Sequence, residues 1–130
     1  NCNVAIRDWQ DEIVFLHRAS RTLVVADLVT NFDVQTASLL GRMLARAVGI
    51  GRGPAASPEH RWYTDDPEAA ARSLARVAAW DFVNLVLAHG ALVEGDGQVV
   101  FAQVSRDLVA AVRRRGARMR RFLAFLARRQ

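Results

Sequence analysis

The stretch EIVFLHRASRTLVVAD, residues 12–27, decides the fold of this chain. Residues 12–17 are rich in β-branched and aromatic side chains, a composition typical of a strand. Residues 18–21 are polar and too few for a crossover connection, so we expect the next strand to pair antiparallel as a hairpin. Residues 22–26 are continuously apolar, the pattern of a strand covered on both faces, and Asp27 ends it.

A further buried strand is expected at residues 81–88 (DFVNLVLA), and it ends in His89 and Gly90. A helix is predicted between the two strand regions, over residues 33–48. Its inward residues are expected to be Leu40, Met43, Leu44, Ala47 and Val48. Glycines end this helix and begin a loop that runs to about residue 64.

Two more helices are predicted in the second half of the chain. Residues 66–68 (Asp-Pro-Glu) combine a capping aspartate, a proline in the first turn and an acid near the positive end of the helix dipole. This helix is expected to reach about Ala79. Helical spacing resumes near Phe101 and continues to the end of the chain, with a kink expected at Gly116.

These elements follow the order β-β-α-α-β-α and predict an α/β fold, in which helices pack on a small sheet. Three strands leave one face or edge of the sheet in need of cover, so we expect either a preceding N-terminal segment or a second copy to supply it. At 130 residues the chain suits one domain. We divide it into a body, residues 1–107, and an arginine-rich amphipathic helix, residues 108–130, that packs on the body or extends from it.

The composition excludes several classes of protein. Cys2 is the only cysteine, so neither an internal disulfide nor a thiolate metal cluster can form. No apolar run approaches the roughly 18 residues that a membrane span requires. Since no secretory signal pattern is present either, a soluble protein of the cytoplasm is expected.

Asp27 and His89 are the candidate functional residues, because ligands of open α/β sheets bind at the carboxyl ends of strands. A carboxylate after LVVA is costly to bury unless it is paired or bound to a cation. A histidine after LVLA is a natural metal ligand, and Gly90 lets the backbone turn sharply beside it. The alternative, which spacing alone favours, is that Asp27 caps a turn and His89 is an ordinary strand-end histidine.

The stretch EIVFLHRASRTLVVADLVTNF (residues 12–32) and the later WDFVNLVLAHG (residues 80–90) resemble the C-terminal half of the metallo-β-lactamase fold. More narrowly, their S-R-T-L segment, aspartate-ended strand and late A-H-G are similar to an uncharacterised bacterial family of that fold, the DUF4336 group. The segments GRMLARAVGIGRGP and WYTDD also fit, so the resemblance spans residues 10–105. It implies a partial αββα sandwich with a two-metal hydrolase site at one end.

The same resemblance implies roles for the two strand-end residues. Asp27 would bridge two metal ions and His89 would bind the second of them, with zinc or another divalent metal as the cofactor. The main histidine cluster of the fold, H-x-H-x-D-H, is absent from this sequence, and we expect it and one more histidine before Asn1. Two ligands fall short of the roughly three that catalytic zinc needs. The resemblance therefore implies an incomplete or degenerate metal-dependent hydrolase, inactive as this chain alone.

Other candidates rank lower. His17 could reach the same end of the sheet as Asp27, but alternating spacing favours a solvent-facing position. His60 lies with Trp62 and Tyr63 on a loop long enough to cover a site as a lid, although aromatic anchoring of the loop is the commoner explanation. The polar hairpin could hold an anion but consists of ordinary hairpin residues, Arg18, Ser20 and Arg21.

The net charge of +5 arises at one end of the chain. Residues 1–107 hold 10 arginines and 13 acids, whereas residues 108–130 hold 8 arginines and no acid. The eight are Arg113, Arg114, Arg115, Arg118, Arg120, Arg121, Arg128 and Arg129. An apolar stripe runs between them, formed by Met119, Phe122, Leu123 and Leu126.

This pattern leaves several interpretations of the arginine-rich helix open. A solvated arginine face, or docking on the acidic body, is the favoured one. The alternative is a non-enzymatic binding module that docks on an anionic partner, which could be a membrane surface, an acidic protein or a nucleic acid. Nucleic acid is the least favoured of these because no basic motif interleaved with aromatic residues is present.

Overall fold

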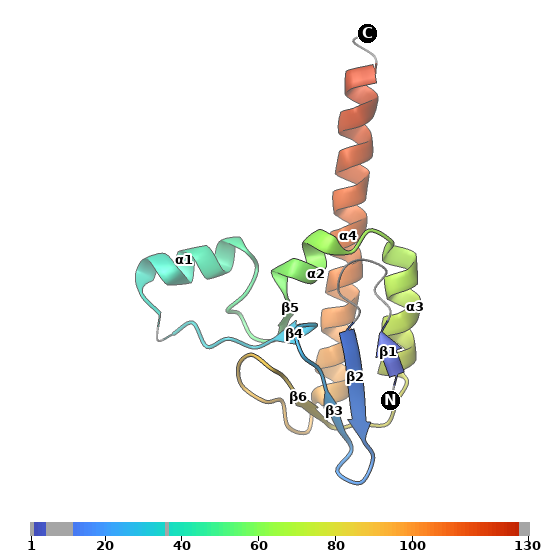
Figure 1. Cartoon of the computed structure of the whole chain (residues 1–130). Helices are drawn as coiled ribbons and strands as arrows, with labels where there is room; N and C mark the ends of the chain where they lie inside the picture. Colours follow the sequence, from blue (N-terminus) through green and yellow to red (C-terminus); the bar gives the residue numbers. More distant parts are fainter. Residues whose placement is uncertain (1, 5–11, 36, 128–130) are drawn as a thin grey trace.

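The structure is a computed structural model that describes residues 2–4, 12–35 and 37–127. It is a mixed α/β fold with two small sheets and a long C-terminal helix (Figure 1). The strands are β1 (Cys2–Val4), β2 (Glu12–His17), β3 (Thr22–Val24), β4 (Val29–Thr30), β5 (Ala55–Ala56) and β6 (Asn84–Val86). The helices are α1 (Leu39–Ala47), α2 (Pro58–Tyr63), α3 (Pro67–Ala78) and α4 (Gly97–Ala127).

The larger sheet has the strand order β1-β2-β3-β6. β2 and β3 form the predicted antiparallel hairpin, in which His17 pairs with Thr22. β3 and β6 are parallel, with Leu23 opposite Leu85. β1 adds an antiparallel edge strand beside β2 that the sequence did not predict.

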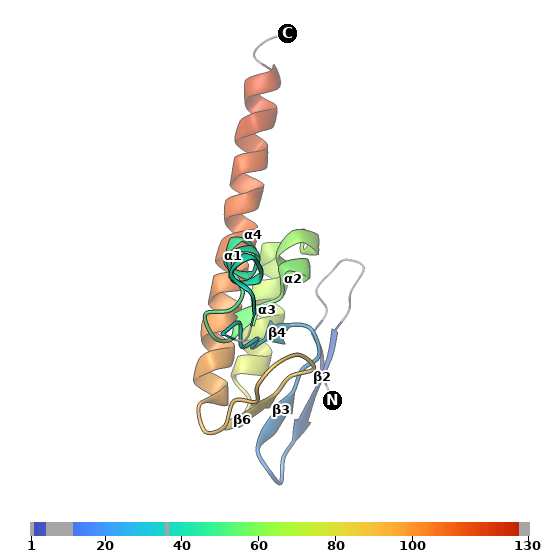
Figure 2. The same ribbon diagram turned by 90° about the vertical axis from the view of Figure 1, so that its left-hand side faces the viewer.

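Helices α3 and α4 lie together on one face of this sheet (Figure 2). Along β2, Val14 is buried whereas Ile13 and Phe15 are exposed. The expectation that residues 22–26 are covered on both faces is therefore wrong: Leu23 is buried but its neighbours on either side are only half-buried. The cause is that the helices of the described chain stack on the same side of the sheet.

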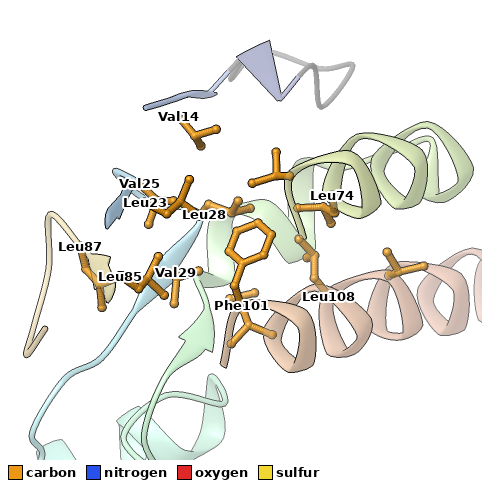
Figure 3. Packing of buried hydrophobic residues seen from close by; sticks show 14 of the residues in the cluster. Val14, Leu23, Val25, Leu28, Val29, Leu74, Leu85, Leu87, Phe101 and Leu108 are labelled. Atoms are coloured by element: carbon orange, nitrogen blue, oxygen red, sulfur yellow. The ribbon is translucent and has the colours of Figure 1, made fainter. Parts of the chain in front are cut away.

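The core lies between the sheet and these two helices (Figure 3). Phe101 of α4 is at its centre and packs edge-on against Phe82, with ring centroids 5.9 Å apart. Leu74 and Val77 of α3 contribute from the neighbouring helix. The predicted start of α3 is confirmed, since the Asp66 carboxylate accepts hydrogen bonds from the first backbone amides of the helix.

Helix α1 corrects the sequence prediction in length and in packing. It is shorter than the expected 33–48, and it stands away from the body (Figure 1). None of its residues is buried, so the predicted inward residues Leu40, Met43 and Leu44 are exposed. The physical reason is the pairing of β4 with β5, which fixes both ends of this segment on the body while the helix between them projects outward.

The C-terminal helix begins earlier and is more regular than predicted. α4 runs without interruption from Gly97 through Gly116, where a kink was expected. The proposed division between residues 107 and 108 falls inside this helix. One side of the helix packs in the core as far as Val112, and its outer end extends beyond the body (Figure 1).

The central position of Phe101 makes a stability prediction. Phe101→Ala should lower the free energy of unfolding by about 3–5 kcal/mol, because it removes a fully buried ring and leaves a cavity. Val99→Ala, on the exposed side of the same helix, should change it by less than about 0.5 kcal/mol. Urea unfolding followed by circular dichroism measures both. Equal effects of the two substitutions would contradict this description of the core.

Candidate functional site

Asp27 and His89 lie side by side at one end of the larger sheet. Asp27 follows β3 and His89 follows β6, and these two strands are parallel neighbours. The distance from His89 Nε2 to Asp27 Oδ1 is 3.2 Å, and the side chains are 56% and 47% exposed respectively. The structure thus brings together the two residues that the sequence singled out, in a place that solvent and ligands can reach.

The backbone around His89 is fixed by the segment that follows Asp27. The amide of Asn31 donates to the His89 carbonyl at 3.1 Å, and the Asn31 carbonyl accepts from the Ala91 amide at 3.0 Å. Gly90 has φ +104°, and a Cβ there would lie 2.1 Å from the Asn31 carbonyl oxygen. Only glycine fits this turn, as the sequence suggested. The Phe32 ring stacks on the His89 imidazole with centroids 6.1 Å apart.

The backbone at Asp27 is held by a residue that the sequence reasoning missed, Glu12. Its Oε1 accepts from the Ala26 amide at 2.8 Å and its Oε2 from the Asp27 amide at 3.1 Å. The same Oε2 lies 3.2 Å from Nε2 of His60. Glu12 therefore accepts from two backbone amides and contacts the His60 ring at the turn where β3 ends, and this turn sets the position of Asp27.

His60 has a different role from the lid that was considered for it. It lies on the short helix α2, and its side chain is only 3% exposed, against 6% for Glu12. The segment 49–64 is accordingly not a free loop over the site. It carries a strand and a helix, and it packs His60 beneath the turn that holds Asp27.

A signal for Glu12 was present in the sequence. Residues alternate between faces along a strand, so Glu12 shares a face with Val14, whose side chain belongs to the core. An acid in an inward position needs buried partners. What the sequence could not supply is the identity of those partners, since one of them is 48 residues away.

His17 lies away from the candidate site. It pairs with Thr22 at the start of β3, whereas Asp27 follows the other end of that strand. It is exposed, as alternation favoured, and its Nδ1 shares a 2.7 Å hydrogen bond with Ser20 Oγ. The hairpin arginine Arg21 is engaged in an ion pair with Asp81.

The donor set at the Asp27–His89 pair falls short of a catalytic metal centre. In the part of the chain that the structure describes, no group of three or more histidine, cysteine or acidic side chains is placed to hold a metal ion. Asp27 and His89 supply two donors, and catalytic zinc needs about three. As they stand, the carboxylate can orient the imidazole, and the pair can offer one oxygen and one nitrogen to a cation.

The predicted anion-binding arginines divide into two groups. Arg113 forms a bidentate pair with Glu68, with bonds of 3.0 and 2.9 Å. Arg115 donates to three carbonyls at the end of α2, among them that of Thr64 at 2.6 Å. These two are bound to the body rather than available to an anion. The exposed remainder comprises Arg114, Arg118, Arg120 and Arg121, while Arg128 and Arg129 lie outside the described residues.

The buried carboxylate makes a second stability prediction. Glu12→Gln should lower the free energy of unfolding by about 1–3 kcal/mol, because an amide NH2 group would replace one acceptor oxygen beneath the Ala26 and Asp27 amides. Glu59→Gln, an exposed position on α2, should stay within about 0.5 kcal/mol of the parent chain. Urea unfolding gives both values, and a Glu12→Gln chain as stable as the parent would disprove the anchoring role.

Comparison of the sequence with protein-family models, with curated proteins and with solved structures gives no match. The metallo-β-lactamase resemblance accordingly rests on the residues quoted for it.

Proposed function

We propose that this chain is an incomplete metallo-β-lactamase-like domain of the DUF4336 kind, in which Asp27 and His89 form part of a divalent-metal site. The observation that carries the proposal is the 3.2 Å approach of His89 Nε2 to Asp27 Oδ1 at the carboxyl ends of two parallel strands. An imidazole nitrogen and a carboxylate oxygen are both ligands of zinc and related metals.

Two features of the surroundings support a binding role over simple turn capping. Within the described residues, the Asp27 carboxylate accepts no hydrogen bond from a backbone amide of the turn that follows it, and its Oδ1 lies beside His89 instead. The His89 ring is held by stacking on Phe32 and by a turn that only glycine permits. Both side chains are therefore positioned by neighbours while their polar atoms stay accessible, which is what a ligand site requires.

The proposed site is incomplete, because the described residues supply two ligands. Hydrolysis by a metal-activated water would need at least one more donor, from a further segment or a second polypeptide.

Metal titration tests the assignment. The chain should bind Zn2+ or Co2+ weakly, and Asp27→Ala or His89→Ala should weaken binding at least roughly tenfold, since even outer-shell substitutions at metal sites cost about that much. His17→Ala is the matched control, an exposed histidine at the opposite end of β3, and it should leave affinity unchanged. Isothermal titration calorimetry measures all four chains. Metal binding that survives both site substitutions, or that is lost in His17→Ala, would refute the assignment.

A hydrolysis assay tests separately whether the proposed metal site is incomplete. Zinc-saturated chain should give no hydrolysis of p-nitrophenyl esters or phosphodiesters above the buffer rate, because a two-ligand site does not hold a catalytic ion in place. Turnover that disappears in Asp27→Ala would show the opposite, a complete site within these residues.

A further inference from the structure

The outer half of α4 carries a face that nothing in the described chain covers. Phe101, Leu108 and Val112 lie on one side of this helix and are buried. Helical spacing continues the same side as Met119, Phe122, Leu123 and Leu126. These four are exposed, because the body ends below them (Figure 1). The apolar side of α4 that packs in the core therefore continues, exposed, along the outer half of the helix.

Helix α1 also has an exposed apolar side. Leu40, Met43 and Leu44 share one side of the helix and are exposed, while Arg42 and Arg46 lie on the other. No acid occurs between residues 34 and 58. Both projecting helices therefore combine bare apolar side chains with arginine as the charged residue.

The two helices are joined through α2 by arginine contacts. Arg61 of α2 donates to the carbonyls of Val48 and Gly49 at the end of α1, at 3.4 and 3.3 Å. Arg115 of α4 donates in turn to carbonyls at the end of α2. Figure 2 views α1 along its axis and in line with α4, so one plane passes along both helices.

A groove lies where these elements meet. Its apolar lining is formed by Val48, Trp62, Met119 and Phe122. Arg114 and Arg118 also line it. Neither arginine makes an ion pair within the residues that the structure describes, unlike Arg113 and Arg115. We use the name arginine–apolar surface for three adjoining parts of the molecule. They are this groove, the outer half of α4 (residues 114–126) and the side of α1 that carries Leu40, Met43 and Leu44.

We infer that the arginine–apolar surface binds the face of an anionic phospholipid bilayer. An interfacial helix buries its apolar side at the boundary of headgroups and acyl chains while basic residues meet lipid phosphates. Arg114 and Arg118 are placed for that contact beside the apolar groove, and long arginine stems reach from such a position toward water. No helix of the described chain is long and apolar enough to cross the bilayer, so this contact is peripheral.

Charge and shape favour this occupant over the others. Pairing of the groove with a second copy would bring Arg114 and Arg118 of the two chains close together, and residues 108–130 contain no acid that could offset their repulsion. A nucleic acid would use the arginines but leave the exposed leucine, methionine and phenylalanine side chains in water. The helix of a partner protein would fill the groove alone, whereas the exposed apolar residues extend along both α1 and the outer half of α4, through which one plane passes (Figure 2). A bilayer meets both at once. This inference goes beyond the proposed metal site and does not depend on it.

Vesicle co-sedimentation tests the inference with the full chain. The chain should sediment with vesicles of phosphatidylcholine mixed with phosphatidylglycerol and much less with phosphatidylcholine alone. Phe122→Ser combined with Leu123→Ser should weaken binding roughly tenfold or more, because it removes interfacial burial. Arg114→Gln combined with Arg118→Gln should do the same, because each arginine loses a lipid phosphate. Circular dichroism should show unchanged folding, since all four residues are exposed.

Matched controls lie outside the surface. Leu92→Ser with Val99→Ser removes two exposed apolar residues, and Arg72→Gln with Arg106→Gln removes two exposed arginines; both should bind within about twofold of the parent chain. Controls that weaken binding as much as the test variants would overturn the inference. The inference would also be overturned if the chain bound neutral vesicles as well as anionic ones. It would be overturned too if the chain bound a short DNA duplex as tightly as anionic vesicles and the serine variant bound that duplex equally well. A dimer in light scattering that the serine variant converts to monomer would assign the surface to a second copy instead.

Discussion

The buried carboxylate of Glu12 is the interaction on which the rest of the candidate site depends. It accepts hydrogen bonds from the amides of Ala26 and Asp27 and contacts the His60 ring. A carboxyl group loses several kcal/mol of hydration on burial, so it is tolerated where donors replace the water. The donors to Glu12 are backbone amides of the turn after β3, and His60 of α2 lies beside the same carboxylate. One side chain therefore joins three separate segments and fixes the place where the chain turns at Asp27.

The parts of the fold that the sequence predicted depend on local physics. A short polar link between two strand-like runs specifies a hairpin, and Asp66 before a proline specifies the start of α3. The direction in which α1 projects depends instead on the β4–β5 pairing between residues more than twenty positions apart. An amphipathic pattern predicts a helix with one apolar side but does not say what covers that side. For α1 and the tip of α4, no described residue does.

The residues of the candidate site likewise divide into those that local sequence predicts and those that depend on contacts between distant segments. Asp27 and His89 could be found because each ends a strand, and strand ends of parallel neighbours meet. The prediction of Gly90 succeeded because a turn of positive φ excludes other residues. The contact between Glu12 and His60 was not predicted because it joins distant segments of the chain. The sequence shows that an inward acid needs a partner but does not identify that partner. His17 was only a lower-ranked candidate, and the direction of the hairpin places it at the other end of the sheet from Asp27.

Helix α2, only six residues long, connects the site with the arginine–apolar surface. His60 points inward to Glu12, whereas Arg61 binds the end of α1 and Trp62 lines the groove. Its last carbonyls accept from Arg115, so α4 holds it from the other side. Consecutive side chains of one short helix thus contact different parts of the molecule. α2 therefore contacts both the carboxylate that holds the turn at Asp27 and the arginine–apolar surface.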